Sequence, residues 1–231
     1  MRPLPPMGEQ FGWKDGLPWS QRFQDHYYSR DDGLAESRYV FLQGNRLPDR
    51  WYNRSTFTVG ELGFGTGLNV LAVWDLWRAS RREGRRLAIH SVEAYPLTAT
   101  EAQTALAQWP ELSTRAEVLI SKWPDLRSGA IALDGQTDLH VHHGYAAERL
   151  SDFPDDVDAW FLDGFAPDRN HDMWDATTLS MVATRTVAGG TFATYTAAGW
   201  VRRNLEAAGF AVKRVPGFRS KRHMTVGEKQ P

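Results

Sequence analysis

Three glycines stand at alternate positions where a strand pattern gives way to a helix pattern. They are Gly63, Gly65 and Gly67, within the segment TVGELGFGTGLNVLAVWDLW that begins at Thr58 and ends at Trp77. Glycine inside a regular element costs about 0.5–1 kcal/mol relative to alanine, because it loses more backbone freedom on folding. The cluster therefore indicates a backbone that turns sharply here or closely approaches another group.

From Phe57 onward, strand patterns alternate with helix patterns. Helical spacing of apolar residues predicts helices over 67–80, 96–109 and 197–209. The strands expected are 57–62, 86–93, 137–144, 157–165, 190–196, 210–215 and 224–228. Helices between strands imply right-handed crossovers and parallel neighbours, whereas the last two strands leave no room for a helix and should pair antiparallel. The pattern predicts an α/β fold over residues 56–231: a doubly wound, mostly parallel, seven-stranded Rossmann-like sheet.

Residues 1–55 differ in character and form an aromatic N-terminal extension. They are rich in proline and glycine but also contain large apolar rings, at Trp13, Trp19, Phe23, Tyr27, Tyr28, Tyr39, Phe41, Trp51 and Tyr52. A disordered tail has few aromatic residues, so this segment is expected to pack on the core.

Composition excludes several classes of protein. The chain has no cysteine, which removes disulfides, thiolate metal sites and cysteine nucleophiles. His142 and His143 are adjacent, but no HExxH pattern accompanies them, so no metal site is expected. No apolar run reaches the roughly 18–20 residues of a membrane helix. The opening MRPLPPMGEQ lacks the apolar core of a signal peptide, so we expect a cytoplasmic protein without membrane contact.

The glycine turn predicts a nucleotide-type cofactor site at the carboxyl edge of the sheet. A phosphate-binding loop would need a lysine followed by serine or threonine, and neither follows here. A dinucleotide site would need a third glycine where Leu68 stands. S-adenosylmethionine fits better, because a bare turn lets the backbone approach its methionine part. The residues expected to contact it are Glu61, Gly63, Phe64, Gly65, Thr66, Gly67 and Asn69.

Two carboxylates follow other strands. Glu93 ends the second strand, where a carboxylate can accept hydrogen bonds from both ribose hydroxyls; otherwise it is a surface residue before a helix. Asp163 ends the fourth strand beside the expected position of the methyl group. There it can orient an amine and stabilise its developing charge, or simply cap the turn before Gly164. Phe165 and Trp174 are candidates for a wall on which a planar base stacks, or for ordinary core.

Several long motifs resemble, in order and spacing, the methyltransferase domain of the MnmC family and its stand-alone form MnmD. They are GFGTGLN, SVEAYPLT, DAWFLDGFAPDRNHDMW, TAAGWVRRNLEAAGF and GFRSKRHM, with DDGLAESRYVFLQGN nearer the N-terminus. The resemblance implies a class I methyltransferase of tRNA. Its members methylate the amine of 5-aminomethyl-2-thiouridine at the wobble position, leaving S-adenosylhomocysteine.

The resemblance also implies roles for single residues. Gly63 to Asn69 match the cofactor turn, Glu93 the ribose carboxylate and Asp163 the group that handles the amine. Tyr145 stands where the family often has an acidic residue, so tyrosine is expected at the adenine. Two-domain relatives carry a flavin-dependent oxidase. This chain stops at Pro231, so no FAD is expected in it, and a separate oxidase partner is possible.

The net charge is only −1, but basic residues are concentrated near the C-terminus. Together with the resemblance, this points to the phosphates of a tRNA anticodon stem-loop as the partner of Arg202, Arg203, Arg219, Lys221 and Arg222. Three alternatives stay open: an amine methyltransferase acting on a small molecule or a protein, a non-catalytic RNA-binding relative, and an NAD-dependent oxidoreductase.

Overall fold

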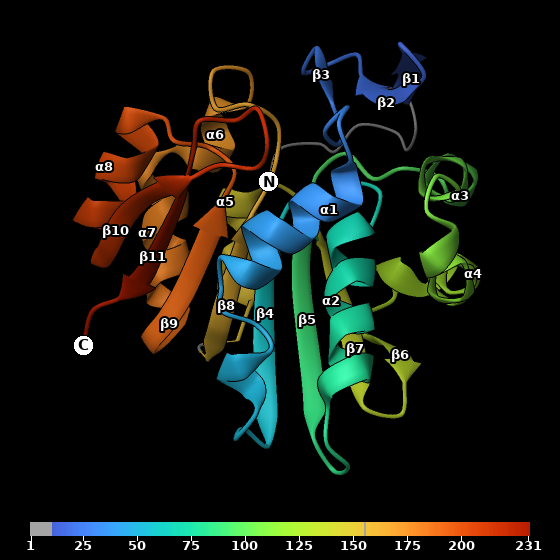
Figure 1. The fold of residues 1–231 in the computed structure, drawn as a ribbon, viewed down its shortest axis with the longest axis horizontal. Helices are drawn as coiled ribbons and strands as arrows, with labels where there is room; N and C mark the ends of the chain where they lie inside the picture. The colour runs from blue at the N-terminus through green and yellow to red at the C-terminus, as the bar shows by residue number, and fades with distance from the viewer. Residues whose placement is uncertain (1–10, 155) are drawn as a thin grey trace.

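The computed structural model describes residues 11–154 and 156–231, so the expectation about a signal peptide in the first ten residues lies outside the described chain. At the centre is an eight-stranded sheet in the order β10-β11-β9-β8-β4-β5-β7-β6 (Figure 1). Its strands are β4(Thr56–Leu62), β5(Arg86–Glu93), β6(Ile131–Asp134), β7(Thr137–His143), β8(Val157–Leu162), β9(Thr186–Thr194), β10(Phe210–Pro216) and β11(His223–Lys229). Strands β9, β8, β4, β5 and β7 are parallel to their neighbours in this series.

Helices cover both faces of this sheet. They are α1(Gly33–Ser37), α2(Leu68–Ser80), α3(Ala99–Leu106), α4(Ser113–Ser121), α5(Ala146–Arg149), α6(His171–Trp174), α7(Ala176–Thr184) and α8(Gly199–Ala207). Short turns of other helix types are η1(Arg38–Gln43), η2(Asp49–Trp51), η3(Pro110–Leu112), η4(Trp123–Arg127) and η5(Leu150–Asp152). In β8, Ala159 and Phe161 face one apolar cluster and Trp160 and Leu162 face the other, because successive side chains of a strand point to opposite faces.

The predicted fold class is confirmed, with one correction to the strand count. The sheet has eight strands rather than seven, because β6 pairs antiparallel with β7 at the edge of the sheet. The sequence IALD is too short to show the alternation that marks a strand, and only the turn at Gly135 and Gln136 brings it beside β7. The expected antiparallel pair is β10 and β11, and β11 inserts between β10 and β9.

Local signals explain where two helices begin or end. Thr98 caps α3: its hydroxyl accepts the Glu101 N–H, and the Glu101 carboxylate accepts the Thr98 N–H. Helix α8 ends just before Gly209, whose φ of 97° lies in the left-handed region that glycine adopts without strain.

The N-terminal segment packs on the large sheet and on α2. It begins with a small antiparallel sheet of β1(Phe11–Lys14), β2(Leu17–Ser20) and β3(Asp25–His26). Leu34, Phe41 and Trp51 then belong to the same apolar cluster as the buried side of α2. The Asn45 amide donates to the Trp160 carbonyl at 3.1 Å, which joins the segment to β8. In the described part of the chain, no helix combines the length and apolar character needed to cross a membrane.

Candidate active site

A cavity of about 480 Å³ opens at the carboxyl ends of β4, β5, β7 and β8. It brings together many of the residues singled out from sequence, although they come from distant parts of the chain. Those that line it are Gly63, Phe64, Gly65, Thr66, Asn69, Glu93, Tyr145, Asp163, Phe165 and Lys221. The volume lies in the range of cavities that hold small ligands.

The glycine turn forms part of the lining of this cavity. Gly63, Gly65 and Gly67 have φ angles of 84°, 52° and 81°, a region that strains other residues. Gly67 does not line the cavity but turns the chain into α2, and a Cβ there would lie 2.9 Å from Leu119 Cδ2. The turn leaves bare backbone facing the cavity at Gly63 and Gly65, which is the close approach that the sequence predicts.

Glu93 connects the end of β5 to the glycine turn. Its Oε2 accepts the Gly65 N–H at 2.8 Å and its Oε1 accepts the Tyr95 N–H at 2.6 Å. Burial raises the pKa of this carboxyl, and the backbone N–H groups of Gly65 and Tyr95 oppose that rise. Each carboxylate oxygen has a second lone pair, so Glu93 can still accept hydroxyl donors from the cavity.

Asp163 is held by two donors. Its Oδ2 accepts the Asn69 side-chain amide at 2.7 Å, and its Oδ1 accepts the Gly164 N–H at 2.8 Å. Asn69 is in turn oriented by the Ser37 hydroxyl, which donates to its Oδ1 at 2.6 Å. Burial is the main cause that raises the pKa of Asp163 to about 6, while the hydrogen bonds from Asn69 and Gly164 lower it. The result is a rigid carboxylate that exchanges protons near neutral pH.

Glu61 does not line the cavity, although it was expected to contact the cofactor. It is 1% exposed within β4, where the Ser91 hydroxyl donates to its Oε2 at 2.5 Å. Burial, followed by smaller effects of its neighbours, raises its pKa to about 8, so this carboxyl carries its proton at pH 7. It lies next to Asn69, behind the cavity wall rather than facing the cavity.

Of the two predicted wall residues, only Phe165 lines the cavity. Trp174 is fully buried, and its indole N–H donates to the Phe165 carbonyl at 3.1 Å. Phe23 stacks on Phe165 with ring centroids 4.6 Å apart, and Tyr27 meets the same ring edge-on at 5.1 Å. Trp174 therefore fixes the backbone of Phe165, whereas the N-terminal segment supplies the neighbouring rings.

The N-terminal extension, which the sequence predicts to pack on the core, also contributes to the site. Phe23, Asp25, Tyr27 and Glu36 all line the cavity. Asp25 Oδ2 accepts the Ala166 N–H at 3.0 Å, which ties the segment to the loop after β8. The density of aromatic residues before residue 55 was the signal that this segment packs on something. Nothing in the pattern, however, shows that it packs over the ends of the strands.

The predicted basic residues divide into two groups. Lys221 enters the cavity, where its Nζ lies 2.7 Å from Glu36 Oε1. Arg219 donates to the Asp31 carbonyl at 2.9 Å and lies 3.9 Å from Asp32 Oδ2. The remaining three, Arg202, Arg203 and Arg222, have no carboxylate partner within the described residues. Only this second group is free to neutralise charges from outside.

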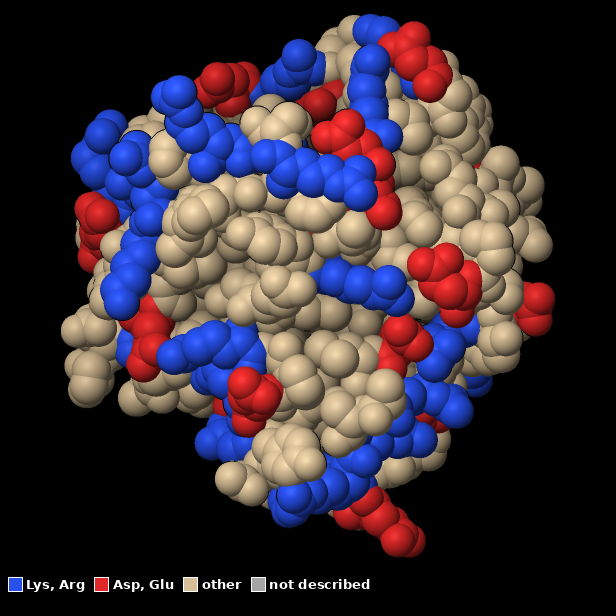
Figure 2. Space-filling view, in the orientation of Figure 1, with Lys and Arg blue, Asp and Glu red and all other residues tan. Residues whose placement is uncertain are grey.

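Two of the three arginines that lack a carboxylate partner among the described residues, Arg202 and Arg222, belong to one surface. The pKa of His223 is lowered by desolvation and then by the nearby charges of Arg214, Arg222 and Arg202, so these groups lie close together. Figure 2 shows Lys and Arg side chains across the upper left of the molecule, over α8 and the β10–β11 pair. A second basic stretch, at residues 78–86, is partly neutralised: Arg78 and Arg81 share Asp134, and Arg86 pairs with Asp138.

Comparison with known proteins identifies the class of enzyme. A family model described as S-adenosyl-L-methionine-dependent methyltransferase matches residues 110–230, more than half of the 231-residue chain. The chain belongs to this family. The predictions of a methyltransferase and of S-adenosylmethionine as cofactor are therefore confirmed.

Curated relatives of this methyltransferase share the name tRNA 5-methylaminomethyl-2-thiouridine biosynthesis bifunctional protein MnmC. The relative from Caulobacter sp. (strain K31) is 48% identical over 221 residues, which cover 91% of this chain and 36% of the relative. The relative from Pseudomonas fluorescens (strain Pf0-1) is 43% identical over 235 residues, covering 99% and 36%. The resemblance to the MnmC family is thus confirmed, and the chain spans about a third of the length of these relatives.

Solved structures confirm the fold of the methyltransferase. MNMC2 from Aquifex aeolicus has a TM-score of 0.74 and 24% identity, and the match covers 98% of this chain and 72% of that one. A spermidine synthase has a TM-score of 0.57 with 11% identity. At these identities the likeness concerns the fold alone.

Proposed function

We propose that this methyltransferase acts on the primary amine of 5-aminomethyl-2-thiouridine at the tRNA wobble position and gives 5-methylaminomethyl-2-thiouridine. The observation that carries the proposal is the sequence identity to relatives named for the biosynthesis of that nucleoside. It amounts to 48% over 91% of the chain for one relative and 42% over 98% for another. The geometry of Asp163 supports an amine as the acceptor.

S-adenosylmethionine, when bound, supplies an electrophilic methyl group and leaves as S-adenosylhomocysteine. The cavity fits such a group, because bare backbone at Gly63 and Gly65 lies beside the Glu93 carboxylate. The two free lone pairs of Glu93 suit the ribose hydroxyls, and Tyr145 lines the side of the cavity beyond β7, where the adenine is proposed to bind. Phe64, Thr66 and the backbone of Gly63–Gly65 are the proposed contacts of the methionine part of the cofactor.

Asp163 is the proposed catalytic residue. A primary alkylamine resembles lysine, whose pKa is about 10.4, so it arrives protonated and must lose a proton before nitrogen can attack. With a pKa of about 6, Asp163 is ionised above neutral pH and can accept the amine N–H. Asn69 and Gly164 keep the carboxylate in one orientation, which aligns the nitrogen lone pair toward the methyl group.

Two details refine the contacts proposed for the substrate. Phe23 already covers one face of Phe165, so a base can stack only on the other face unless Phe23 moves. Lys221 is exposed at the cavity, where its ammonium group lies against Glu36. We therefore assign Lys221 to the electrostatics of the active site and not to an anticodon phosphate.

The proposed contacts with the anticodon stem-loop are Arg202, Arg203 and Arg222. These guanidinium groups have no carboxylate partner among the described residues, and they stand on α8 and in the loop before β11. Phosphate contacts of this kind release counterions, so binding should weaken steeply as salt rises. A cytoplasmic location and a separate FAD-dependent oxidase that supplies the amine stay predictions.

The test is methyl transfer from radiolabelled S-adenosylmethionine to three acceptors: tRNA carrying the unmethylated aminomethyl base, fully modified tRNA, and a free primary amine. The proposal expects label in the first acceptor alone. Transfer to the free amine at a similar rate would favour an amine methyltransferase that acts on a small molecule. Tight cofactor binding without transfer to tRNA would assign the site to a different amine, and absence of cofactor binding would favour a non-catalytic RNA-binding role.

A further inference from the structure

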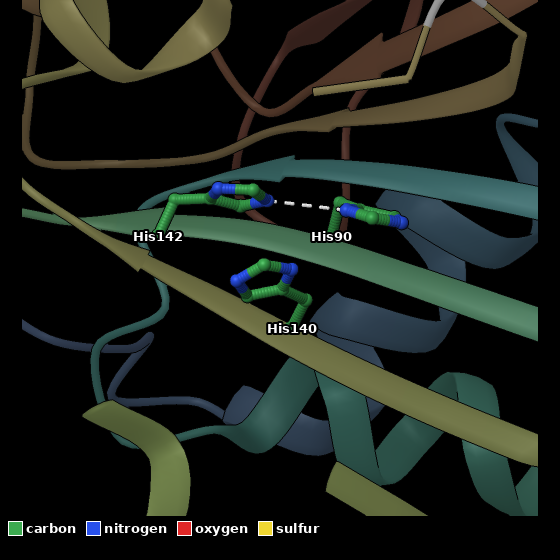
Figure 3. A group of neighbouring side chains, drawn as sticks. All are labelled: His90, His140 and His142. Atoms are coloured by element: carbon green, nitrogen blue, oxygen red, sulfur yellow. Dashed lines mark hydrogen bonds between the residues drawn. The ribbon is translucent and has the colours of Figure 1, made fainter. Parts of the chain in front are cut away.

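Three histidines meet on one face of the sheet, outside the active-site cavity. His90 of β5 and His140 of β7 are partners in the parallel register, and His142 lies two residues further along β7. Residues two apart in a strand share a face, so all three rings point to the same side (Figure 3). None of them lines the cavity. Sequence analysis expected no metal site, because it considered the adjacent pair His142 and His143 instead of the alternate pair.

The nitrogens of this cluster lie close enough to share one ion. His90 Nδ1 and His142 Nε2 are 3.1 Å apart, and one ligand atom from each of the three rings lies within 4.8 Å of the others. Zinc binds imidazole nitrogen at about 2.0–2.1 Å, which places tetrahedral ligands roughly 3.3 Å apart. The stacked rings of His140 and His142 would have to rotate out of their parallel arrangement before both lone pairs point at one ion.

The packing around the three imidazole rings holds them close together, which favours binding of one shared metal ion. His142 is 6% exposed and lies between the His140 ring at 4.0 Å and the Phe153 ring at 4.5 Å. Within the described residues His90 Nδ1 and His142 Nε2 are partners, and one shared ion would serve both of these nitrogens together with His140.

We propose that His90, His140 and His142 bind a divalent transition-metal ion, with Zn²⁺ as its representative. All three ligands are imidazoles, which suit zinc, copper, nickel and cobalt and not magnesium or calcium. The ion joins β5 to β7 just before these strands deliver Glu93 and Tyr145 to the cavity. Its role is to hold two strands together, because the cluster does not face the reacting groups.

The experiment uses untagged full-length protein, treated with a chelator and then titrated with Zn²⁺ in competition with a chromophoric chelator. Thermal unfolding is followed with and without Zn²⁺, and Co²⁺ absorption reports the ligand geometry. We expect one equivalent of Zn²⁺ to bind and to raise Tm, since an ion that binds only the folded state stabilises it. His90→Gln and His142→Gln should each weaken binding by more than about tenfold.

His143→Gln is the matched control: it changes the next residue of β7, whose side chain faces the opposite side of the sheet. This variant should bind Zn²⁺ as the wild type does. If the variants at the buried positions do not fold, the half-buried His140→Gln takes their place. Absence of Zn²⁺ binding and of any Tm shift in the wild type would overturn the proposal. The proposal would also be overturned if His143→Gln lost Zn²⁺ affinity as strongly as the cluster variants, or if the cluster variants bound Zn²⁺ as the wild type does.

Discussion

Replacing Asp163 with asparagine should slow the methyltransferase and, at the same time, stabilise its fold. The pKa of this carboxyl is raised from 3.8 to about 6, and one unit is worth about 1.4 kcal/mol. The ionised carboxylate therefore costs the folded state about 3 kcal/mol above pH 6. Asparagine removes that cost but leaves one of the two donors, Asn69 or Gly164, without an acceptor, which costs about 1–2 kcal/mol.

The net gain in the free energy of unfolding is about 1–2 kcal/mol, or ~2–8 °C in Tm for a chain of this size. This gain in stability depends on pH. The wild type loses stability as pH rises from 3.8 through about 6, so the advantage of Asp163→Asn is present at pH 8 and absent near pH 4. Meanwhile, loss of the group that accepts the amine proton should lower kcat about 100-fold or more.

Two measurements check this prediction: thermal unfolding at pH 5 and pH 8, and single-turnover methyl transfer with saturating cofactor. Asp168→Asn is the control, because Asp168 is an exposed carboxylate of the same loop. It should change neither quantity. A variant at position 163 that keeps the wild-type rate, or that is less stable than the wild type at pH 8, would refute the reasoning.

Three further predictions concern neighbouring groups. Lys221→Met should shift the acid limb of the pH–rate profile upward, and Glu36→Gln should shift it downward, because their charges respectively lower and raise the pKa of Asp163; shifts of the opposite sign would disprove this coupling. Glu93→Gln should weaken cofactor binding about tenfold or more in calorimetry, since one backbone or ribose donor loses its acceptor; unchanged affinity would remove Glu93 from the site. Arg222→Ala should lower the slope of log K against log [salt] for tRNA by about 1, with cofactor affinity unchanged. An unaltered slope would mean that this arginine contacts no phosphate.

Much of the site could be predicted from sequence because its residues lie at the ends of strands. Glu93 ends β5, Asp163 follows β8, and the glycine turn follows β4. Carboxyl ends of neighbouring parallel strands meet at one edge, so local patterns were sufficient to bring these groups together. The positive φ angles of Gly63 and Gly65 agree with the conformational reason for a glycine cluster.

Contacts across long stretches of sequence could not be predicted. Lys221 reaches Glu36 because the loop between β10 and β11 folds back over α1, and neither residue carries a pattern that indicates the other. Trp174 illustrates a second limit: an aromatic residue near a site is equally compatible with core and with a wall, and only packing shows that it is fully buried. The histidine cluster needed the register of β5 against β7, which single-strand patterns do not contain.

Nucleoside mass spectrometry of the wobble position tests the central claim most directly. Substrate tRNA carrying 5-aminomethyl-2-thiouridine is incubated with S-adenosylmethionine and either the wild type or Asp163→Asn, then digested and analysed. Our account predicts that the wild type adds one methyl group to the aminomethyl nitrogen and that the variant leaves the nucleoside nearly unchanged. A wild type that binds cofactor but leaves this nucleoside unaltered, or methylates another position, would contradict it.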